Sequence, residues 1–189
     1  MIIKMRVGLF FSFWAYPLLG TGLFLVSRWL EPEVPRRLFL LWLPLGLMAW
    51  TFMEYAVHRF LFHWRPQNRK LQRFIAQLHM VHHGDSHDPQ QILVRPRFSL
   101  PVSGVIFGLL YWATGMSTAS GLLLGIWSGF LYYEAVHYRV HMSKKSSGLL
   151  QLQRRAHFIH HFIDEESCFG VTSPIWDILL GTFRRNDQP

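Results

Sequence analysis

Four long apolar runs constrain the fold of this chain more than any other feature of its sequence. They occupy residues 7–30, 38–62, 98–116 and 119–136, and each supplies about 20 residues, the length that an α-helix needs to cross a hydrocarbon core. Half of the 189 residues are hydrophobic and only 16% are charged, against about a quarter in soluble domains. We therefore expect an all-α integral membrane protein with four transmembrane helices in two hairpins. A cleaved signal peptide in the first run, or buried helices of a soluble protein, would be the alternatives.

The basic residues predict how such a bundle is oriented. The net charge is +8, yet the segment between the first two runs holds only Arg28, Arg36 and Arg37. The other 16 Lys and Arg residues lie in the N-terminal tip, in residues 59–97 and after Val136. Because cytoplasmic loops carry the excess of Lys and Arg, we predict that both termini are cytoplasmic. Segments 63–97 and 137–189 then form a cytosolic helical cap, in a single domain of residues 1–189. We expect anionic lipid, not nucleic acid, to attract this charge.

Histidine is unusually frequent, with 11 copies, as many as all the carboxylates together. Ten of them form four clusters: His58 and His63; His79, His82 and His83; His137 and His141; and His157, His160 and His161. Histidines three or four residues apart share one face of a helix. Two ions with four or five imidazole ligands each would use eight to ten histidines, so this pattern predicts a two-metal site.

The spacing of His58 and His63 and the position of His87 differ from the rest of the histidine pattern. His58 and His63 are five residues apart, about 140° around an α-helix, so we expect the helix to end or bend between them. His87 stands outside the clusters, in a polar segment with Asp85 that is typical of a turn.

Acidic residues close to the clusters are candidates to orient the ligands. Glu54 precedes His58 by four residues, Glu134 precedes His137 by three, and Asp164 follows His160 by four. A carboxylate that accepts the second N–H of a ligating imidazole fixes its tautomer. For the two glutamates, the alternative is a polar side chain that reaches the membrane interface.

The chain also repeats itself. Ala56-Val57-His58 and Ala135-Val136-His137 begin the histidine-containing parts of the two halves, and each half ends in a His-x2-His-His cluster. Two apolar runs precede the histidines in each half, which predicts parallel repeats that bring two equivalent histidine sets to one face.

The clusters resemble the histidine boxes of the fatty acid hydroxylase and sterol desaturase superfamily, a group of membrane di-metal oxygenases. The segments His58-Arg59-Phe60-Leu61-Phe62-His63 and Phe169-Gly170-Val171-Thr172-Ser173-Pro174-Ile175-Trp176-Asp177, with Gly181-Thr182-Phe183, look most like the fatty acid 2-hydroxylase branch. The resemblance covers roughly residues 56–183. It implies that the ten clustered histidines hold two metal ions, functionally iron, although zinc can occupy such sites.

The resemblance further implies O2-dependent hydroxylation of the acyl chain of a membrane lipid, next to its carbonyl. Zinc has no redox chemistry, so this reaction needs iron or a similar ion. Many eukaryotic members carry a fused haem domain with a His-Pro-Gly-Gly motif, which is absent here. We therefore expect a separate electron donor, of the cytochrome b5 or ferredoxin type. Trp176 is the candidate wall of an acyl-chain tunnel.

Other functions remain open at this stage. The same boxes would serve a sterol or carotenoid hydroxylase or a desaturase, and a metal transporter or sensor is the alternative from another class. The expected location is the cytoplasmic membrane if the chain is bacterial and the endoplasmic reticulum if it is eukaryotic.

Overall fold

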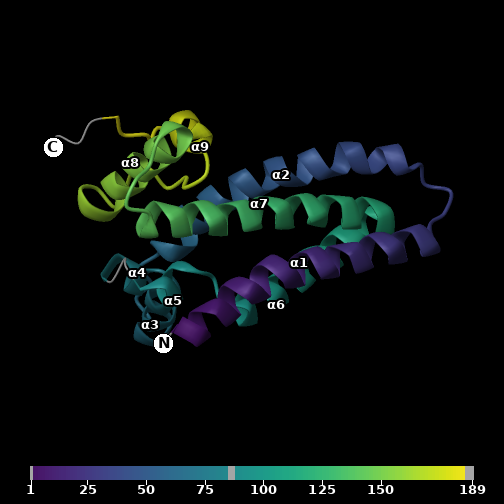
Figure 1. The fold of residues 1–189 in the computed structure, drawn as a ribbon, viewed down its shortest axis with the longest axis horizontal. Helices are drawn as coiled ribbons and strands as arrows, with labels where there is room; N and C mark the ends of the chain where they lie inside the picture. Colours follow the sequence, from purple (N-terminus) through teal and green to yellow (C-terminus); the bar gives the residue numbers. More distant parts are fainter. Residues whose placement is uncertain (1, 85–87, 186–189) are drawn as a thin grey trace. The chain divides into compact units, whose positions relative to one another are not determined.

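The computed structural model describes residues 2–84 and 88–185, and this part of the chain is helical, without strands (Figure 1). The prediction of an all-α fold is confirmed. His87 and Asp85, expected in a polar turn, lie outside the described residues.

Four long helices follow the four apolar runs: α1 (Ile2–Leu30), α2 (Phe39–Ala56), α6 (Pro96–Thr114) and α7 (Met116–Met142). A short 3₁₀ helix, η1 (Arg36–Leu38), precedes α2, and a π-helix, η2 (Val57–Phe62), continues it. Whereas the fourth apolar run ends at residue 136, α7 continues to Met142 and carries His137 and His141. The shorter helices are α3 (Arg69–Leu78), α4 (Met80–Gly84), α5 (Pro89–Ile92), α8 (Gly148–Phe162) and α9 (Ile175–Leu179).

One helical stretch in the described residues, Arg36–Phe62, is long and apolar enough to cross a membrane by its length and composition. Helices α1, α6 and α7 contain 29, 19 and 27 residues. The four-span topology and its orientation therefore stay predictions.

The chain divides into two compact units. One combines the described residues of 1–50 with 94–131, and the other combines those of 51–93 with 132–189. Two of the three boundaries fall inside α2 and α7, so each of these helices contributes residues to both units, and the third lies between α5 and α6.

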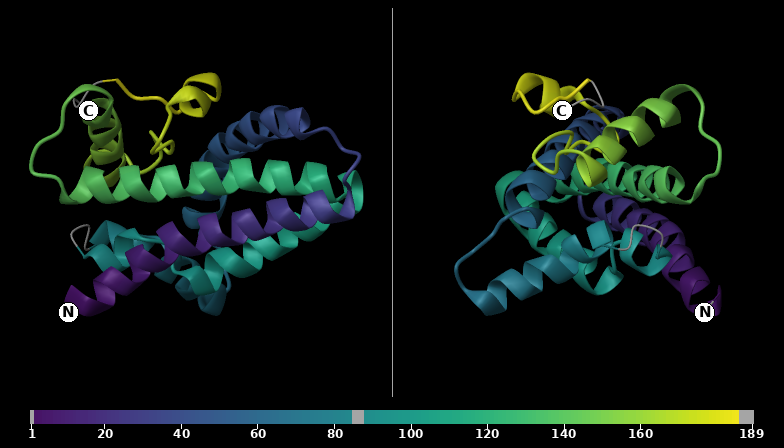
Figure 2. Two further views of the ribbon diagram at one scale, coloured as in Figure 1. Left: turned by 45° about the vertical axis from the view of Figure 1, so that its right-hand side comes forward. Right: turned by 90° about the vertical axis from the view of Figure 1, so that its left-hand side faces the viewer.

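In the first unit, α1, α6 and the N-terminal parts of α2 and α7 run side by side (Figures 1 and 2). The ring of Tyr16 is 1% exposed and packs edge-on against Trp127 and Phe130, with centroids 5.1 and 5.2 Å away. Its hydroxyl donates to Ser99 Oγ at 2.7 Å, and Trp127 Nε1 donates to Ser103 Oγ at 3.0 Å. Two α6 hydroxyls thus satisfy the polar atoms of aromatic side chains in an apolar core.

Glycines allow α2 and α7 to approach closely within this unit. A Cβ placed on Gly125 would lie 2.1 Å from the carbonyl oxygen of Leu43, and one placed on Gly46 would lie 2.1 Å from that of Leu122. No larger residue fits at either position without separating the helices. Small residues at such contacts are typical of helices that pack in membranes.

The second unit contains all ten clustered histidines. It is built from the C-terminal part of α2 with η2, from α3 to α5, from the last turns of α7, and from α8 and α9. Within it, α3–α5 and α8–α9 lie on opposite sides of the end of α7 (Figures 1 and 2).

Candidate metal centre

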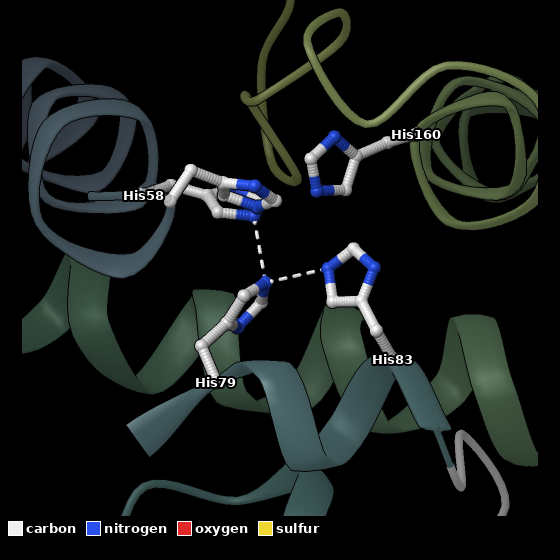
Figure 3. A group of neighbouring side chains, drawn as sticks. His58, His79, His83 and His160 are labelled. Atoms are coloured by element: carbon white, nitrogen blue, oxygen red, sulfur yellow. Dashed lines mark hydrogen bonds between the residues drawn. The ribbon is translucent and has the colours of Figure 1, made fainter. Parts of the chain in front are cut away.

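The ten histidines come together as two groups of five. In each group, one ring nitrogen from every residue lies within 4.8 Å of the corresponding nitrogens of the others. The first cluster consists of His58, His63, His79, His83 and His160, and the second consists of His82, His137, His141, His157 and His161. Figure 3 shows four histidines of the first cluster pointing toward one another, with His79 and His83 on one helical segment and His58 and His160 on two others.

Each cluster takes four histidines from one half of the sequence repeat and one from the other. His160 joins the first cluster although it follows α7, and His82 joins the second although it precedes α6. Both are the middle histidine of a His-x2-His-His box. The other two histidines of each box, four residues apart, stay with their own half. Each half of the sequence therefore contributes one imidazole to the cluster of the other half.

The π-helix η2 explains how His58 and His63 reach the same cluster. The backbone N–H of His63 donates to the carbonyl of His58 at 3.3 Å, an i to i+5 bond. Such a turn holds more residues than an α-helical turn, so His63 returns to the face of His58. Their ring centroids are 5.2 Å apart. The expected irregularity between the two histidines is this π-turn, after which the helix ends.

Main-chain carbonyls orient three of the imidazoles. His58 Nδ1 donates to Phe169 O at 2.6 Å, His160 Nδ1 to Ser167 O at 2.8 Å, and His137 Nδ1 to Ile92 O at 3.1 Å. A carbonyl oxygen can only accept, so Nδ1 carries the proton in each case. The lone pair of Nε2 is then left for the interior of the cluster, as in ligating histidines.

The imidazoles of His82, His83, His160 and His161 are neutral near pH 7. Burial, followed by the repulsion of neighbouring imidazoles, lowers the pKa of His82 and His160 to about 3 and that of His83 to about 4. The same causes lower the pKa of His161. A neutral ring is the form that binds a metal ion.

The donor set fits two transition-metal ions. The Nε2 atoms of His58 and His79 are 3.0 Å apart, those of His82 and His137 are 3.0 Å apart, and those of His141 and His157 are 2.8 Å apart. Two nitrogens bound at 90° to one ion, each at about 2.0–2.1 Å, would be separated by about 2.9 Å. Among the residues that the structure describes, the buried Nε2 atoms of His63 and His160 have no hydrogen-bond partner. A bound cation would satisfy these converging lone pairs.

Two of the predicted carboxylates, Glu54 and Asp164, accept hydrogen bonds from groups other than imidazole. Buried Glu54 accepts hydrogen bonds from the backbone N–H of Val171 and of Thr172, both at 2.7 Å, and from the Thr172 hydroxyl. Asp164 accepts from Arg184 Nη1 at 3.2 Å. Glu134 is fully buried on α7.

The sequence reasoning assigned no role to Asp177, which the structure places in the second unit with 1% exposure. Its carboxylate accepts the backbone N–H of Phe169 and of Gly170 and the hydroxyl of Thr182, each at 2.8 Å. Burial raises the pKa of this carboxyl, and the three hydrogen bonds oppose that effect. A carboxylate inside the apolar run of α9 was the available signal, because such a group is costly to bury without partners.

Trp176, the predicted tunnel wall, lies in the second unit. It donates its indole N–H to Thr51 Oγ1 at 3.0 Å and packs edge-on against Phe52.

A cavity of about 310 Å³ lies beside the first cluster and is lined by His63, Arg59 and Phe169, among others. His63 is therefore the ligand candidate that this cavity reaches.

The fold and the two clusters define an all-helical protein equipped to hold two metal ions through histidine. Residues 43–182 match the sequence pattern of the fatty acid hydroxylase family, and the chain belongs to that family.

Several relatives carry names that describe a reaction. The chain is 31% identical over 165 residues to the fatty acid 2-hydroxylase of Mus musculus, covering 83% of this chain and 43% of that protein. It is 29% identical over 137 residues to the dihydroceramide fatty acyl 2-hydroxylase FAH2 of Arabidopsis thaliana, covering 72% and 58%. The ceramide very long chain fatty acid hydroxylase SCS7 of Saccharomyces cerevisiae is 33% identical over 153 residues, covering 76% and 38%. The chain thus spans about half the length of these relatives or less.

A solved structure has the same fold. It is described as full-length scs7p with only the hydroxylase domain visible, and it superposes with a TM-score of 0.80 at 25% identity. The match covers 93% of this chain and 68% of the other.

Proposed function

We propose that this chain is a membrane-bound, O2-dependent lipid hydroxylase that acts on an acyl chain next to its carbonyl. The observation that carries the proposal is the pair of five-histidine clusters in a member of the fatty acid hydroxylase family. Bound iron would supply the activation of O2, which zinc, without redox chemistry, would not. The relatives' names, 2-hydroxylase above all, favour this reaction over sterol or carotenoid oxidation and over desaturation.

The chain's own residues have three tasks in this proposal. The ten histidines hold the metal ions. All but His63, His83 and His161 are buried, which keeps bulk water away from the reactive centre. The carbonyls of Ser167, Phe169 and Ile92 fix the orientation of three ligands. The surrounding protein must also present one methylene among many similar ones, which is a matter of positioning.

The proposal includes four membrane spans, with both termini and the cap of residues 63–97 and 137–189 on the cytoplasmic side. The lengths of α1, α6 and α7 support it, because 19 residues or more extend about 28 Å at 1.5 Å per residue. Large apolar side chains are exposed along these helices, including Leu18, Val105 and Trp112, the last of them 87% exposed. Lipid would cover such a surface, which is unfavourable in water. On α9, Ile178 and Leu179 are also exposed and suit contact with lipid.

A separate electron donor of the cytochrome b5 or ferredoxin type completes the proposed reaction. Exposed basic residues of the second unit suit an acidic protein of this kind, among them Arg65, Arg69, Lys70 and Arg73. A metal transporter is disfavoured, because five converging imidazoles per ion bind too tightly for release.

The test is lipid mass spectrometry on a host that expresses the chain under ¹⁸O2, with His160→Ala as control. We expect an acyl lipid that gains one labelled oxygen only with the unaltered chain, and fragmentation should place the hydroxyl next to the carbonyl. A labelled hydroxyl elsewhere on the lipid would refute the assigned position. Loss of two hydrogens without label would identify a desaturase instead.

A further inference from the structure

The loop that follows α8 is held by two buried carboxylates. Asp177 accepts the backbone N–H groups of Phe169 and Gly170, both at 2.8 Å. Glu54 accepts those of the next two residues, Val171 and Thr172, both at 2.7 Å. Four consecutive backbone donors thus point at two side-chain acceptors. We call Asp177, Glu54 and the four N–H groups of residues 169–172 the clamp. Charge-assisted hydrogen bonds of this kind are stronger than neutral ones, so the clamp determines where the carbonyl groups of the loop lie.

The carbonyls of the same loop face the first cluster. Phe169 O accepts the Nδ1 proton of His58 at 2.6 Å, and Ser167 O accepts that of His160 at 2.8 Å. Phe169 therefore connects a carboxylate of the clamp to a histidine of the first cluster, since its N–H is bonded to Asp177 and its C=O to His58. His137 of the second cluster is instead oriented by Ile92 O, which lies on a different segment.

Steric fit keeps the clamp close. A Cβ on Gly170 would lie 2.1 Å from the carbonyl oxygen of Ser173 and 2.9 Å from Asp177 Oδ2. Only glycine lets the loop come this near to the carboxylate. On its other side, Asp177 accepts the hydroxyl of Thr182, which lies 3.1 Å from the Tyr55 hydroxyl. Arg59 Nη1 donates to the Tyr55 hydroxyl at 2.6 Å.

We infer that Asp177 is a positioning residue of the first cluster, acting together with Glu54 through the main chain of residues 167–172. By holding this loop, it aims the lone pairs of His58 and His160 at the metal position. The inference rests on the proposed function only in that both require the first cluster to bind a metal ion. In this arrangement the carboxylates hold the loop whose carbonyls accept the Nδ1 protons of the ligating histidines.

The clamp predicts an effect on one cluster only. Removing a partner behind a ligating histidine typically weakens metal affinity about 10–100-fold. Asp177→Asn keeps the size of the side chain but turns one acceptor oxygen into an amide that faces a backbone N–H. We expect the first cluster to lose affinity by this factor, while the second cluster keeps its own.

The experiment measures Co²⁺ binding to the purified full chain in detergent after treatment with a chelator. Visible absorption reports the ligand geometry, and elemental analysis reports the number of ions per chain. We expect two ions for the unaltered chain and one tight plus one weakened ion for Asp177→Asn. In a His141→Ala background, where only the first cluster is complete, Asp177→Asn should remove the remaining tight ion. Glu54→Gln, which releases the other half of the loop, should act in the same direction.

Glu31→Gln is the matched control. Glu31 of the first unit also accepts two consecutive backbone N–H groups, from Met116 at 2.9 Å and Ser117 at 2.8 Å. This change should leave both ions and the Co²⁺ spectrum unaltered.

Two outcomes would overturn the inference. One is unchanged binding of both ions in Asp177→Asn and in Glu54→Gln. The other is an equal loss at both clusters together with a lower melting temperature, which would mark a role in folding alone. Failure of the proposed function is a separate result, because a chain that binds two ions but forms no labelled lipid leaves the clamp intact.

Discussion

Replacing Gly125 by alanine is expected to force α2 and α7 apart within the first unit. The new Cβ would lie 2.1 Å from the carbonyl oxygen of Leu43 and 2.7 Å from the backbone nitrogen of Leu47. Both are main-chain atoms, which cannot rotate away as a side chain does. Ordinary contacts begin near 3.4 Å, so the helices must separate by roughly 1 Å, at the cost typical of an overpacked core.

The size of the effect follows from a comparison with Gly108 on α6. A Cβ on Gly108 meets nothing within 4 Å. Both substitutions place alanine in a helix and gain about 1 kcal/mol of helix preference, which cancels between them. What remains is overpacking, about 1–3 kcal/mol. Gly125→Ala should therefore be less stable than Gly108→Ala by this amount.

The assay is thermal unfolding of both variants in the same detergent. A difference of 1 kcal/mol shifts the melting temperature by about 2–4 °C in a chain of this size. If Gly125→Ala melts no lower than Gly108→Ala, the close approach of α2 and α7 at this glycine is refuted.

The remaining predictions concern the clusters. His160→Ala and His82→Ala should each reduce the bound metal from two ions to one, and the double variant should bind none by elemental analysis; equal loss of both ions in either single variant would contradict the division into two clusters. The metal-free chain should lose stability as pH falls from about 6.5 toward 3, because His82 and His160 have a pKa of about 3 when folded and about 6.5 when unfolded. Below 6.5 the unfolded chain binds more protons, and chemical unfolding at pH 7 and pH 5 would measure the difference. Arg155→Ala, an exposed change, should leave the metal content unaltered.

The helical class and the positions of the long helices were predictable from the sequence, because long apolar runs leave few other folds. The ten histidines were also visible as a set, and the structure brings them into two groups of five. The exchange of His82 and His160 between the groups was not predicted. It depends on how α4 and α8 face each other across the unit, which spacing along one helix does not encode.

The carboxylates show a second limit of reasoning from spacing. Glu54 lies four residues before His58, and a helix brings residues at that spacing to one face. This proximity suggested a direct bond to imidazole. The structure has Glu54 bonded to Val171 and Thr172, more than a hundred positions away. Carbonyl partners are invisible in a sequence because every residue has one, so the clamp emerges only when the loop after α8 is in place.

The π-helix η2 compensates for a difference in histidine spacing between the two halves of the sequence repeat. The first half has four residues between His58 and His63, whereas the second half has three between His137 and His141. In the second half, an ordinary α-helix brings the pair to one face. In the first half, the additional residue is absorbed by the i to i+5 bond between His63 and His58. Since π-turns are rare, one that aligns the two halves is best explained by the cluster, which needs His58 and His63 on the same side. The ring centroids of the two pairs are accordingly 5.2 and 5.1 Å apart, so the pairs are more alike in space than their spacing suggests.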